Sequence, residues 1–261
     1  MYPYLLQIGP ITIASFGLMV ALGFLAALQV LSRELQRREV ADAADLASSI
    51  ITTAMIGGLI GAKLYFVLFE TPPNLEWGEL FDLVFSGYGL TWYGGFIVAT
   101  AAVIWQMRRR AVPVLQVADA TGMALALGYA IGRIGCQLAG DGDYGAPTDL
   151  PWGMAYPNGV VPTLEKVHPA PVYETVAHLA IFAILWKTRE TIGPPGLSFC
   201  AYLVLSGMAR FSVETIRINP RVLWGLSEAQ LISAAMIAVG CACAWWVLRA
   251  ETTRRREVKS E

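Results

Sequence analysis

The sequence contains seven stretches that are apolar and long enough, or nearly long enough, to cross a lipid bilayer as helices. The hydrocarbon core of a bilayer, roughly 30 Å thick, is crossed by a helix of about 20 residues. With 56% hydrophobic and 15% charged residues among 261, the chain is much more apolar than a soluble domain. We therefore predict an all-α, polytopic membrane protein with seven transmembrane helices and a single integral-membrane domain over residues 1–261. The stretches cover residues 11–31, 46–69, 88–107, 114–139, 171–186, 195–216 and 227–248.

Basic residues lie mainly on alternate connections between these stretches. The connections after the first, third and fifth stretches and the tail at 249–261 hold 13 of the 19 Lys and Arg residues, whereas residues 71–87 hold none. Because basic loops remain on the cytoplasmic side, the N-terminus is predicted to lie outside, in the periplasm, and the C-terminus in the cytoplasm. The 140–171 connection then lies outside.

Four other basic residues lie inside or at the end of apolar stretches: Lys63, Arg133, Arg210 and Arg217. A charge in mid-bilayer costs at least about 2.5–3.5 kcal/mol on insertion scales, so such residues usually face a protein or water interior and have a function. The direction of each helix places all four near the outer leaflet. Glu174 and Tyr93 reach the same level. A cationic layer at that depth suits a phospholipid, whose anionic group lies near the interface while its tails stay in the membrane.

Arg210, Glu214 and Arg217 follow an i, i+4, i+7 spacing and so share one helix face. Two interpretations remain open. These charges can bind a ligand, or they can pair internally, Arg210 with Glu214 for example, and lock helices together. Asp119 lies near the opposite end of its stretch, so we interpret it as structural, and His178 is interpreted as a helix-packing residue.

Small residues are spaced to let two helices approach closely. Gly57 and Gly61 stand four positions apart, as in small-xxx-small packing motifs, and Gly94 and Gly95 are paired on the third stretch. This pattern is common in membrane proteins and indicates packing more than function.

The segment GRIGCQLAGDGDYGAPTDLPWGMAYPNG passes from the end of the fourth stretch into a loop rich in Gly, Asp and Pro. Asp141 and Asp143 superficially resemble a calcium loop, but the full ligand pattern is missing, so no metal site is predicted. His168 follows in HPAPVYE and can titrate near neutral pH, which makes it a candidate proton acceptor.

On these segments the chain resembles the prolipoprotein diacylglyceryl transferase family. The matching segments are GGLIGAKLYFVLF, SGYGLTWYGGFI, GRIGCQLAGDGDYG with APTDLPWG, HPAPVYE and GMARFSVETIR. The resemblance implies transfer of the diacylglyceryl group of phosphatidylglycerol to the lipobox cysteine thiol of a lipoprotein precursor, with release of glycerol 1-phosphate. It also implies a transferase in the bacterial cytoplasmic (inner) membrane, with the active site toward the outer leaflet.

The resemblance also implies roles for single residues. Arg133 matches the arginine of the family's GRxG motif, Arg210 and Glu214 match a charged pair, and Asp141 takes an acidic loop position. Three positions depart from the family pattern, with Tyr93 in place of a frequent His, Cys136 in place of a frequent Asn, and Phe16 in place of a typical Tyr. Lys63 stands where many relatives have Arg. These departures leave the general base open.

The predicted mechanism needs cations and a base. Arg133 and Arg210 are expected to bind the phosphate, and Glu214 to orient Arg210. Tyr93 and His168 are the candidates for proton handling. The other predicted substrate contacts are Arg217, Lys63, Gly94, Gly95, Asp141 and Tyr144. No metal, organic cofactor or nucleic acid is predicted; the partners are phosphatidylglycerol, a lipobox peptide and membrane lipid. The alternative is a lipid-binding or lipid-translocating membrane protein without transferase activity.

Overall fold

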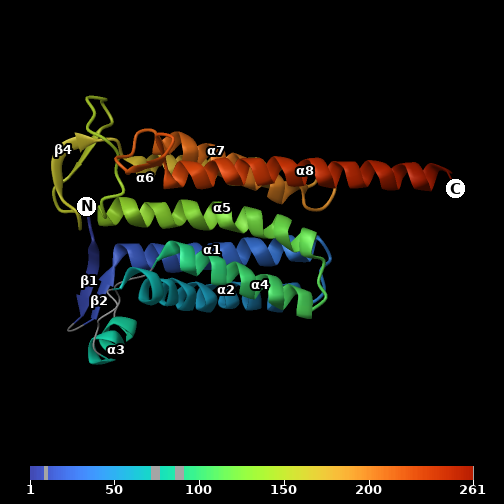
Figure 1. Cartoon of the computed structure of the whole chain (residues 1–261), viewed down its shortest axis with the longest axis horizontal. Helices are drawn as coiled ribbons and strands as arrows, with labels where there is room; N and C mark the ends of the chain where they lie inside the picture. Colours follow the sequence, from blue (N-terminus) through green and yellow to red (C-terminus); the bar gives the residue numbers. More distant parts are fainter. Residues whose placement is uncertain (9–10, 72–76, 86–90, 261) are drawn as a thin grey trace. The chain divides into compact units, whose positions relative to one another are not determined.

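The computed structural model describes residues 1–8, 11–71, 77–85 and 91–260, and these residues are mostly helical (Figure 1). The strands and helices follow in chain order: β1 (Tyr4–Ile8), β2 (Ile11–Ala14), α1 (Ser15–Arg37), α2 (Ala43–Tyr65), the π-helix η1 (Phe66–Glu70), α3 (Trp77–Phe85), α4 (Trp92–Arg109), α5 (Val114–Ala139), β3 (Met154–Tyr156), β4 (Thr163–Val167), α6 (Ala170–Thr188), α7 (Leu197–Glu214), β5 (Arg221–Leu223), β6 (Leu226–Ser227) and α8 (Glu228–Ser260).

A long helix lies at each of the seven predicted stretches. Four of them are long and apolar enough to cross a membrane: α1, α2 with η1, α5 and α8. Large apolar side chains such as Leu25, Leu59 and Trp245 are exposed on these helices, as expected for surfaces in contact with lipid. The helical fold and the membrane character are thus confirmed, while the count of seven spans and their orientation stay predictions.

The ends of two helices differ from the prediction. Residues 11–14 form β2, which pairs antiparallel with β1, so the first helix begins only at Ser15. Three of these four residues (Ile11, Thr12 and Ile13) are β-branched, which favours a strand over a helix. The last helix continues past residue 248 to Ser260, because the charged tail contains no Gly or Pro to end it.

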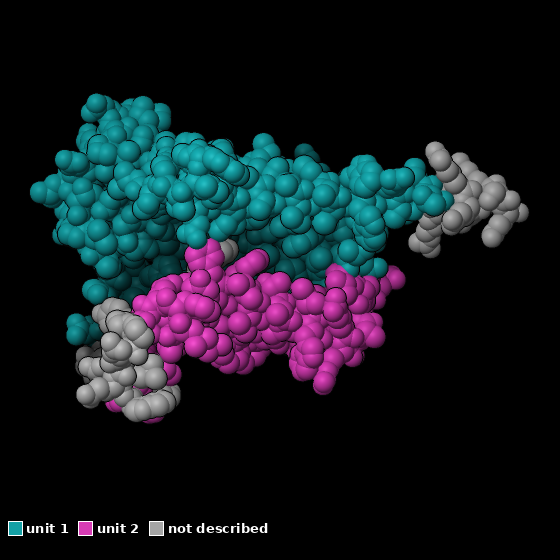
Figure 2. Space-filling model, in the orientation of Figure 1, with its two compact units in different colours: residues 1–31, 115–261 teal, residues 32–114 magenta. Residues whose placement is uncertain are grey.

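The described chain divides into two compact units, residues 1–31 with 115–261 and residues 32–114 (Figure 2). In the second unit α2 packs against α4 through glycines. A Cβ atom on Gly57 would lie 3.2 Å from Cα of Ala99, and one on Gly95 would lie 2.9 Å from the carbonyl oxygen of Gly58. The small-residue packing predicted for these two stretches is therefore confirmed.

In the first unit α7 lies along α8 and also packs on α6. The carboxylate of Asp119, on α5, accepts hydrogen bonds from the backbone N–H groups of Gly196 and Phe199, both at 2.9 Å. It satisfies donors that the first turn of α7 leaves unpaired. The structural interpretation of Asp119 is thus confirmed, and the bond fixes α7 against α5.

A long connection, residues 140–169, joins α5 to α6 and contains the β3–β4 hairpin. It has a small apolar core of its own, in which Tyr144 stacks on Tyr156 with ring centroids 5.0 Å apart and Val167 belongs to the same buried cluster. Gly140 and Gly142 have φ angles of 60° and 92°, which favour glycine. The backbone N–H of Val161 donates to the carbonyl of Gly140 at 2.9 Å. The start of the connection is therefore held against its own hairpin.

Candidate active site

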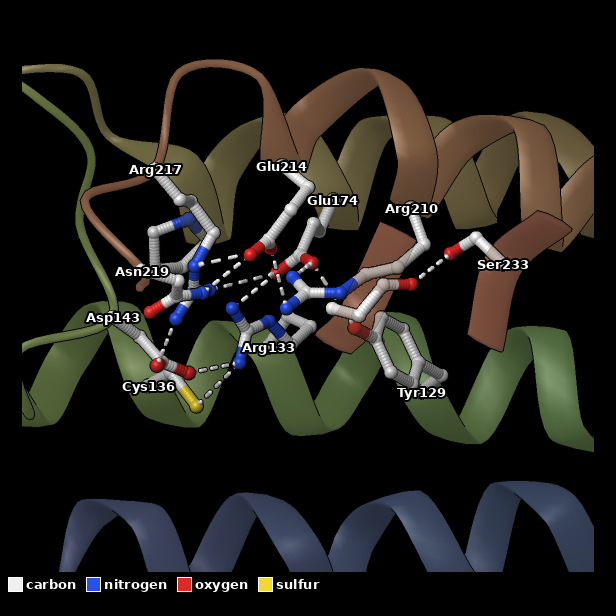
Figure 3. A network of polar contacts seen from close by, with 12 residues as sticks. Tyr129, Arg133, Cys136, Asp143, Glu174, Arg210, Glu214, Arg217, Asn219 and Ser233 are labelled. Carbon is white, nitrogen blue, oxygen red and sulfur yellow. Dashed lines mark hydrogen bonds and ion pairs between the residues drawn. The ribbon is translucent and has the colours of Figure 1, made fainter. Parts of the chain in front are cut away.

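Three helices of the first unit bring charged side chains to one place. Arg133 lies two turns before the end of α5, and Glu174 lies in the second turn of α6. Glu214 is the last residue of α7, and Arg210 lies one turn before it. Figure 3 shows their charged groups pointing toward one another, with Arg217 beside them. The convergence of the arginines predicted from the sequence is therefore present in the structure.

Glu174 is the shared partner of two arginines. Its side chain is 1% exposed, and its Oε1 accepts from Nη1 of Arg210 at 2.5 Å while its Oε2 pairs with Nη2 of Arg133. The hydroxyl of Tyr129 donates to Oε1 at 3.2 Å. Because a buried carboxylate is costly unless it is paired and hydrogen-bonded, these contacts account for its burial. Glu174 thus sets the separation between the two guanidinium groups.

Glu214 is held by neutral and charged donors together. Its Oε2 lies 2.8 Å from Nη2 of Arg210, the pair predicted from the i, i+4 spacing. Its Oε1 accepts from Nδ2 of Asn219 at 2.6 Å and from the hydroxyl of Ser227 at 2.8 Å. Arg217 also approaches, with Nε 3.8 Å from Oε2. Glu214 therefore pairs with Arg210 and ties α7 to the segment that follows it; its role in a reaction stays a prediction.

Asp143 joins Arg133 to Arg217 from the 140–169 connection. Its Oδ2 pairs with Nη1 of Arg133 and its Oδ1 pairs with Nη2 of Arg217. Burial alone would raise the pKa of Asp143, but the two arginines outweigh it and lower the pKa to about 2. Asp143 is therefore ionised at neutral pH. Its side chain is 34% exposed, compared with 1% for Glu174 and 0% for Glu214.

The arginines are consequently matched by acids. Arg133, Arg210 and Arg217 form ion pairs with Asp143, Glu174 and Glu214, so the formal charges of these six groups cancel. The internal pairing that the sequence leaves open is thus present along with the predicted convergence. A ligand anion has to compete with these carboxylates for the guanidinium groups.

Asp141, the loop acid chosen from the family resemblance, lies beside Asp143. Its Oδ1 accepts the backbone N–H of Asp143 at 3.3 Å, which shapes the turn, and burial raises the pKa of Asp141. Cys136 contributes its sulfur 3.3 Å from Nη1 of Arg133. Ligand atoms of Cys136, Asp141 and Asp143 lie within 4.8 Å of one another. Because the arginines already bind both oxygens of Asp143, this group suits a cation poorly.

His168 and Tyr144 lie in the same connection as Asp143. The Nδ1 atom of His168 is 3.3 Å from the hydroxyl of Tyr173, which also accepts from Nε1 of Trp152 at 2.7 Å. Among the described contacts, the His168 ring thus meets Tyr173 rather than an arginine. The Tyr144 hydroxyl donates to the carbonyl of Val161 at 3.1 Å, so this side chain stabilises the connection.

Four of the predicted site residues belong to the second unit. Nζ of Lys63 donates to the carbonyl of Leu83 at 3.0 Å, and the Tyr93 ring lies 6.4 Å from that of Tyr65. Gly94 and Gly95 are buried against α2, which by itself explains their small size. The roles of these residues toward a substrate stay predictions.

Sequence reasoning did not select Glu174, Asp143 or Tyr129 as site residues. The sequence does contain a signal for the two acids. Three arginines at one predicted membrane depth require counter-charges, and Glu174 and Asp143 lie at or next to that depth. The interpretation of His178 as a packing residue is confirmed, since its Nδ1 lies 2.9 Å from the carbonyl of Glu174 and its Nε2 lies 3.1 Å from the hydroxyl of Ser206.

The fold and the site define a multi-pass membrane protein with a buried cluster of arginines and acids between three helices. The family model for prolipoprotein diacylglyceryl transferase matches residues 3–246. The chain is 32% identical to the phosphatidylglycerol–prolipoprotein diacylglyceryl transferase of Parasynechococcus marenigrum, with 95% of this chain and 94% of the relative covered. The enzyme of the same name from Pseudomonas putida is 30% identical, with 97% and 96% covered. The chain belongs to the prolipoprotein diacylglyceryl transferase family.

Proposed function

We propose that this chain transfers the diacylglyceryl group of phosphatidylglycerol to the lipobox cysteine of a prolipoprotein, releasing glycerol 1-phosphate. Relatives that bear the name of this activity match nearly the whole chain. The observation that carries the assignment of the site is the convergence of Arg133 and Arg210 on the buried carboxylate of Glu174.

Arg133, Arg210 and Arg217 bind the phosphate of the lipid in this proposal. A guanidinium group offers several N–H donors in a fixed plane, which suits the oxygens of a phosphate better than the point charge of an ammonium. Glu174 and Glu214 hold two of these groups in position and are largely shielded from solvent. The arginines are therefore prepared before the substrate arrives, which is what electrostatic stabilisation of a transition state requires.

The reaction itself exchanges one bond for another. The sulfur of the lipobox cysteine attacks the carbon of the diacylglyceryl group that carries the phosphate; a carbon–sulfur bond forms as the bond between this carbon and the phosphate oxygen breaks. The oxygen keeps the electron pair and leaves as part of glycerol 1-phosphate. The arginines stabilise the negative charge that develops on this oxygen.

The thiol must lose its proton, because a thiol with a pKa near 8.5 is a poor nucleophile until it is deprotonated. Tyr93 and His168 are the proposed proton-handling residues. A role for His168 is supported by its position near Asp143. The backbone N–H of Gly145, two residues after Asp143, donates to the His168 carbonyl at 2.8 Å. The proton then passes to solvent, because a phosphate monoester with a second pKa near 6 is mostly deprotonated at neutral pH.

We further propose seven spans with the site toward the outer leaflet of the bacterial cytoplasmic membrane. The alternation of basic connections supports this orientation. Phosphatidylglycerol then enters from the surrounding lipid, and the lipobox peptide approaches from the same side.

A reconstituted assay tests the proposal. The purified chain in vesicles containing labelled phosphatidylglycerol should modify a lipobox peptide, and should not modify a matched peptide with serine in place of the lipobox cysteine. Vesicles of phosphatidylcholine alone should give no product. Binding of phosphatidylglycerol without any transfer would instead indicate a lipid-binding or lipid-translocating protein.

A further inference from the structure

Of the three acids in the arginine cluster, Asp143 alone is both accessible and bound only by arginines. Its carboxylate contacts Arg133 and Arg217, and no neutral donor among the described residues bonds to it. Glu174 and Glu214, by contrast, also accept hydrogen bonds from Tyr129, Asn219 and Ser227, and both are buried.

The position of Asp143 is that of a bound anion. Its two carboxylate oxygens each pair with a different guanidinium group, as two oxygens of a phosphate group would. The Nε atoms of Arg133 and Arg217 are buried and have no hydrogen-bond partner among the described residues, although Nε of Arg217 lies 3.8 Å from Oε2 of Glu214. The phosphodiester of phosphatidylglycerol matches a carboxylate in offering two free oxygens and one negative charge, and the phosphate monoester that the reaction releases presents three oxygens and more charge.

The side chain can leave without rearrangement of the backbone. Its neighbours are fixed, since Tyr144 is buried on Tyr156 and Gly145 bonds to His168. The Asp143 side chain itself is one-third exposed. Rotation about its Cα–Cβ bond therefore moves the carboxylate toward solvent, and rotations between staggered conformers are routine for an exposed side chain.

We propose that Asp143 is a resident anion that occupies the phosphate position between Arg133 and Arg217 and is displaced when a phosphate group binds. This inference rests on the proposed function for the identity of the ligand as phosphatidylglycerol or its product. Asp143 is thus a positioning residue: it keeps the two arginines apart and neutralised until the substrate arrives. Its carboxylate then competes with the substrate phosphate for the two guanidinium groups.

The test compares Asp143→Asn with Asp143→Glu and with Asp149→Asn. The Glu variant keeps the competing charge. Asp149 is an exposed acid of the same connection, so its replacement removes the same charge from the same surface. Inorganic phosphate is the probe, and its affinity is measured by thermal-shift titration of each full-length chain in detergent. The Michaelis constant for phosphatidylglycerol and the turnover rate are measured in parallel.

Removal of the resident carboxylate should tighten phosphate binding about tenfold or more, because the remaining acids no longer balance the arginines. The Michaelis constant for phosphatidylglycerol should fall by a similar factor, with a smaller change in turnover. Asp149→Asn should stay within about twofold of the wild-type chain in both constants, and Asp143→Glu, which keeps the competing charge, should show no gain in phosphate affinity. This pattern separates competition from a general effect of surface charge.

Three outcomes overturn the inference. The first is that phosphate binds to Asp143→Asn no more tightly than to the wild-type chain. The second is that Asp149→Asn shows the same gain in affinity. The third is that Asp143→Asn and Asp143→Ser both fail to fold, which would make the carboxylate a structural requirement. A different result would overturn the proposed function. If no chain transfers diacylglyceryl but phosphate binding still tightens in Asp143→Asn, the anion position stands and the transferase assignment does not.

Discussion

At the scale of single residues, Glu174 is the carboxylate on which the arrangement of the cluster depends. It is fully buried and pairs with two arginines from two other helices, and Arg217 lies 3.9 Å away. Loss of one partner of a buried ion pair usually costs more than the pair contributes, because the other charge stays buried and unpaired.

We therefore expect Glu174→Gln to lower the free energy of unfolding by about 3 kcal/mol and to lower the rate of transfer as well. Thermal unfolding in detergent micelles measures the first effect. Glu165→Gln, at an exposed position of β4, is the matched control and should change stability by no more than about 0.5 kcal/mol. Equal stabilities of the two variants would show that Glu174 is not the centre of the cluster.

The pH dependence of stability should carry a contribution from Asp143. Its pKa is lowered to about 2 in the folded chain, so its contribution is fully present above the ordinary carboxyl pKa near 4 and is lost as the pH falls through about 2. After allowance for the partly exposed side chain, we expect a loss of about 1 kcal/mol across this window.

Denaturation of the wild-type chain and of Asp143→Asn between pH 5 and pH 2 isolates this contribution from those of other carboxyls. The difference in stability between the two chains should shrink toward the acid end. A difference that stays constant with pH would mean that the folded-state pKa of Asp143 is not lowered.

The sequence predicted the cations of this site better than its acids. Arg133, Arg210 and Arg217 stand out because a charge inside an apolar stretch is costly and therefore rare. Asp143 lies in a loop rich in polar residues, where an acid is ordinary. Only the folded connection reveals that Asp143, more than Asp141, faces the arginines.

At the scale of elements, the contact of α2 with α4 depends on small residues. A Cβ atom on Gly61 would lie 2.6 Å from Cβ of Val98 and would also collide with the carbonyl oxygen of Gly94. On the same helix, a Cβ atom on Gly58 would meet no described atom within 4 Å.

Gly61→Ala should consequently destabilise the chain by about 1–3 kcal/mol, since a methyl group forces the helices apart. Gly58→Ala should be neutral or should stabilise by up to about 1 kcal/mol through helix propensity. Unfolding of both variants in detergent provides the comparison. Identical effects at the two positions would contradict the packing of α2 on α4.

The helices themselves were predictable because long apolar stretches leave few alternatives in a membrane. The residues at which the helices begin and end were less predictable. The short hairpin of β1 and β2 is as apolar as the helix that follows it, so hydropathy alone does not separate them. Its β-branched residues are a local signal for strands.

At the scale of the whole molecule, the alternation of basic connections predicts that the 140–169 connection faces outward and the tail faces the cytoplasm. A membrane-impermeant maleimide added to intact cells should therefore label Asp149→Cys and should label Glu251→Cys only after the membrane is opened. The unmodified chain is the control for its native cysteines. The reverse labelling pattern would invert the orientation and the proposed approach of the peptide.

The central claim is that paired guanidinium groups, held by buried acids, stabilise the phosphate that leaves during diacylglyceryl transfer. The rate of transfer by Arg133→Lys tests it most directly. Lysine keeps the positive charge but cannot reach both Glu174 and the phosphate with separate donors. Arg255→Lys is the control, because Arg255 is also ion-paired, with Glu251 at 2.8 Å, but lies in the exposed tail. We predict a loss of about a hundredfold or more for Arg133→Lys and an unchanged rate for Arg255→Lys; an Arg133→Lys chain that folds and transfers at the wild-type rate would contradict the account.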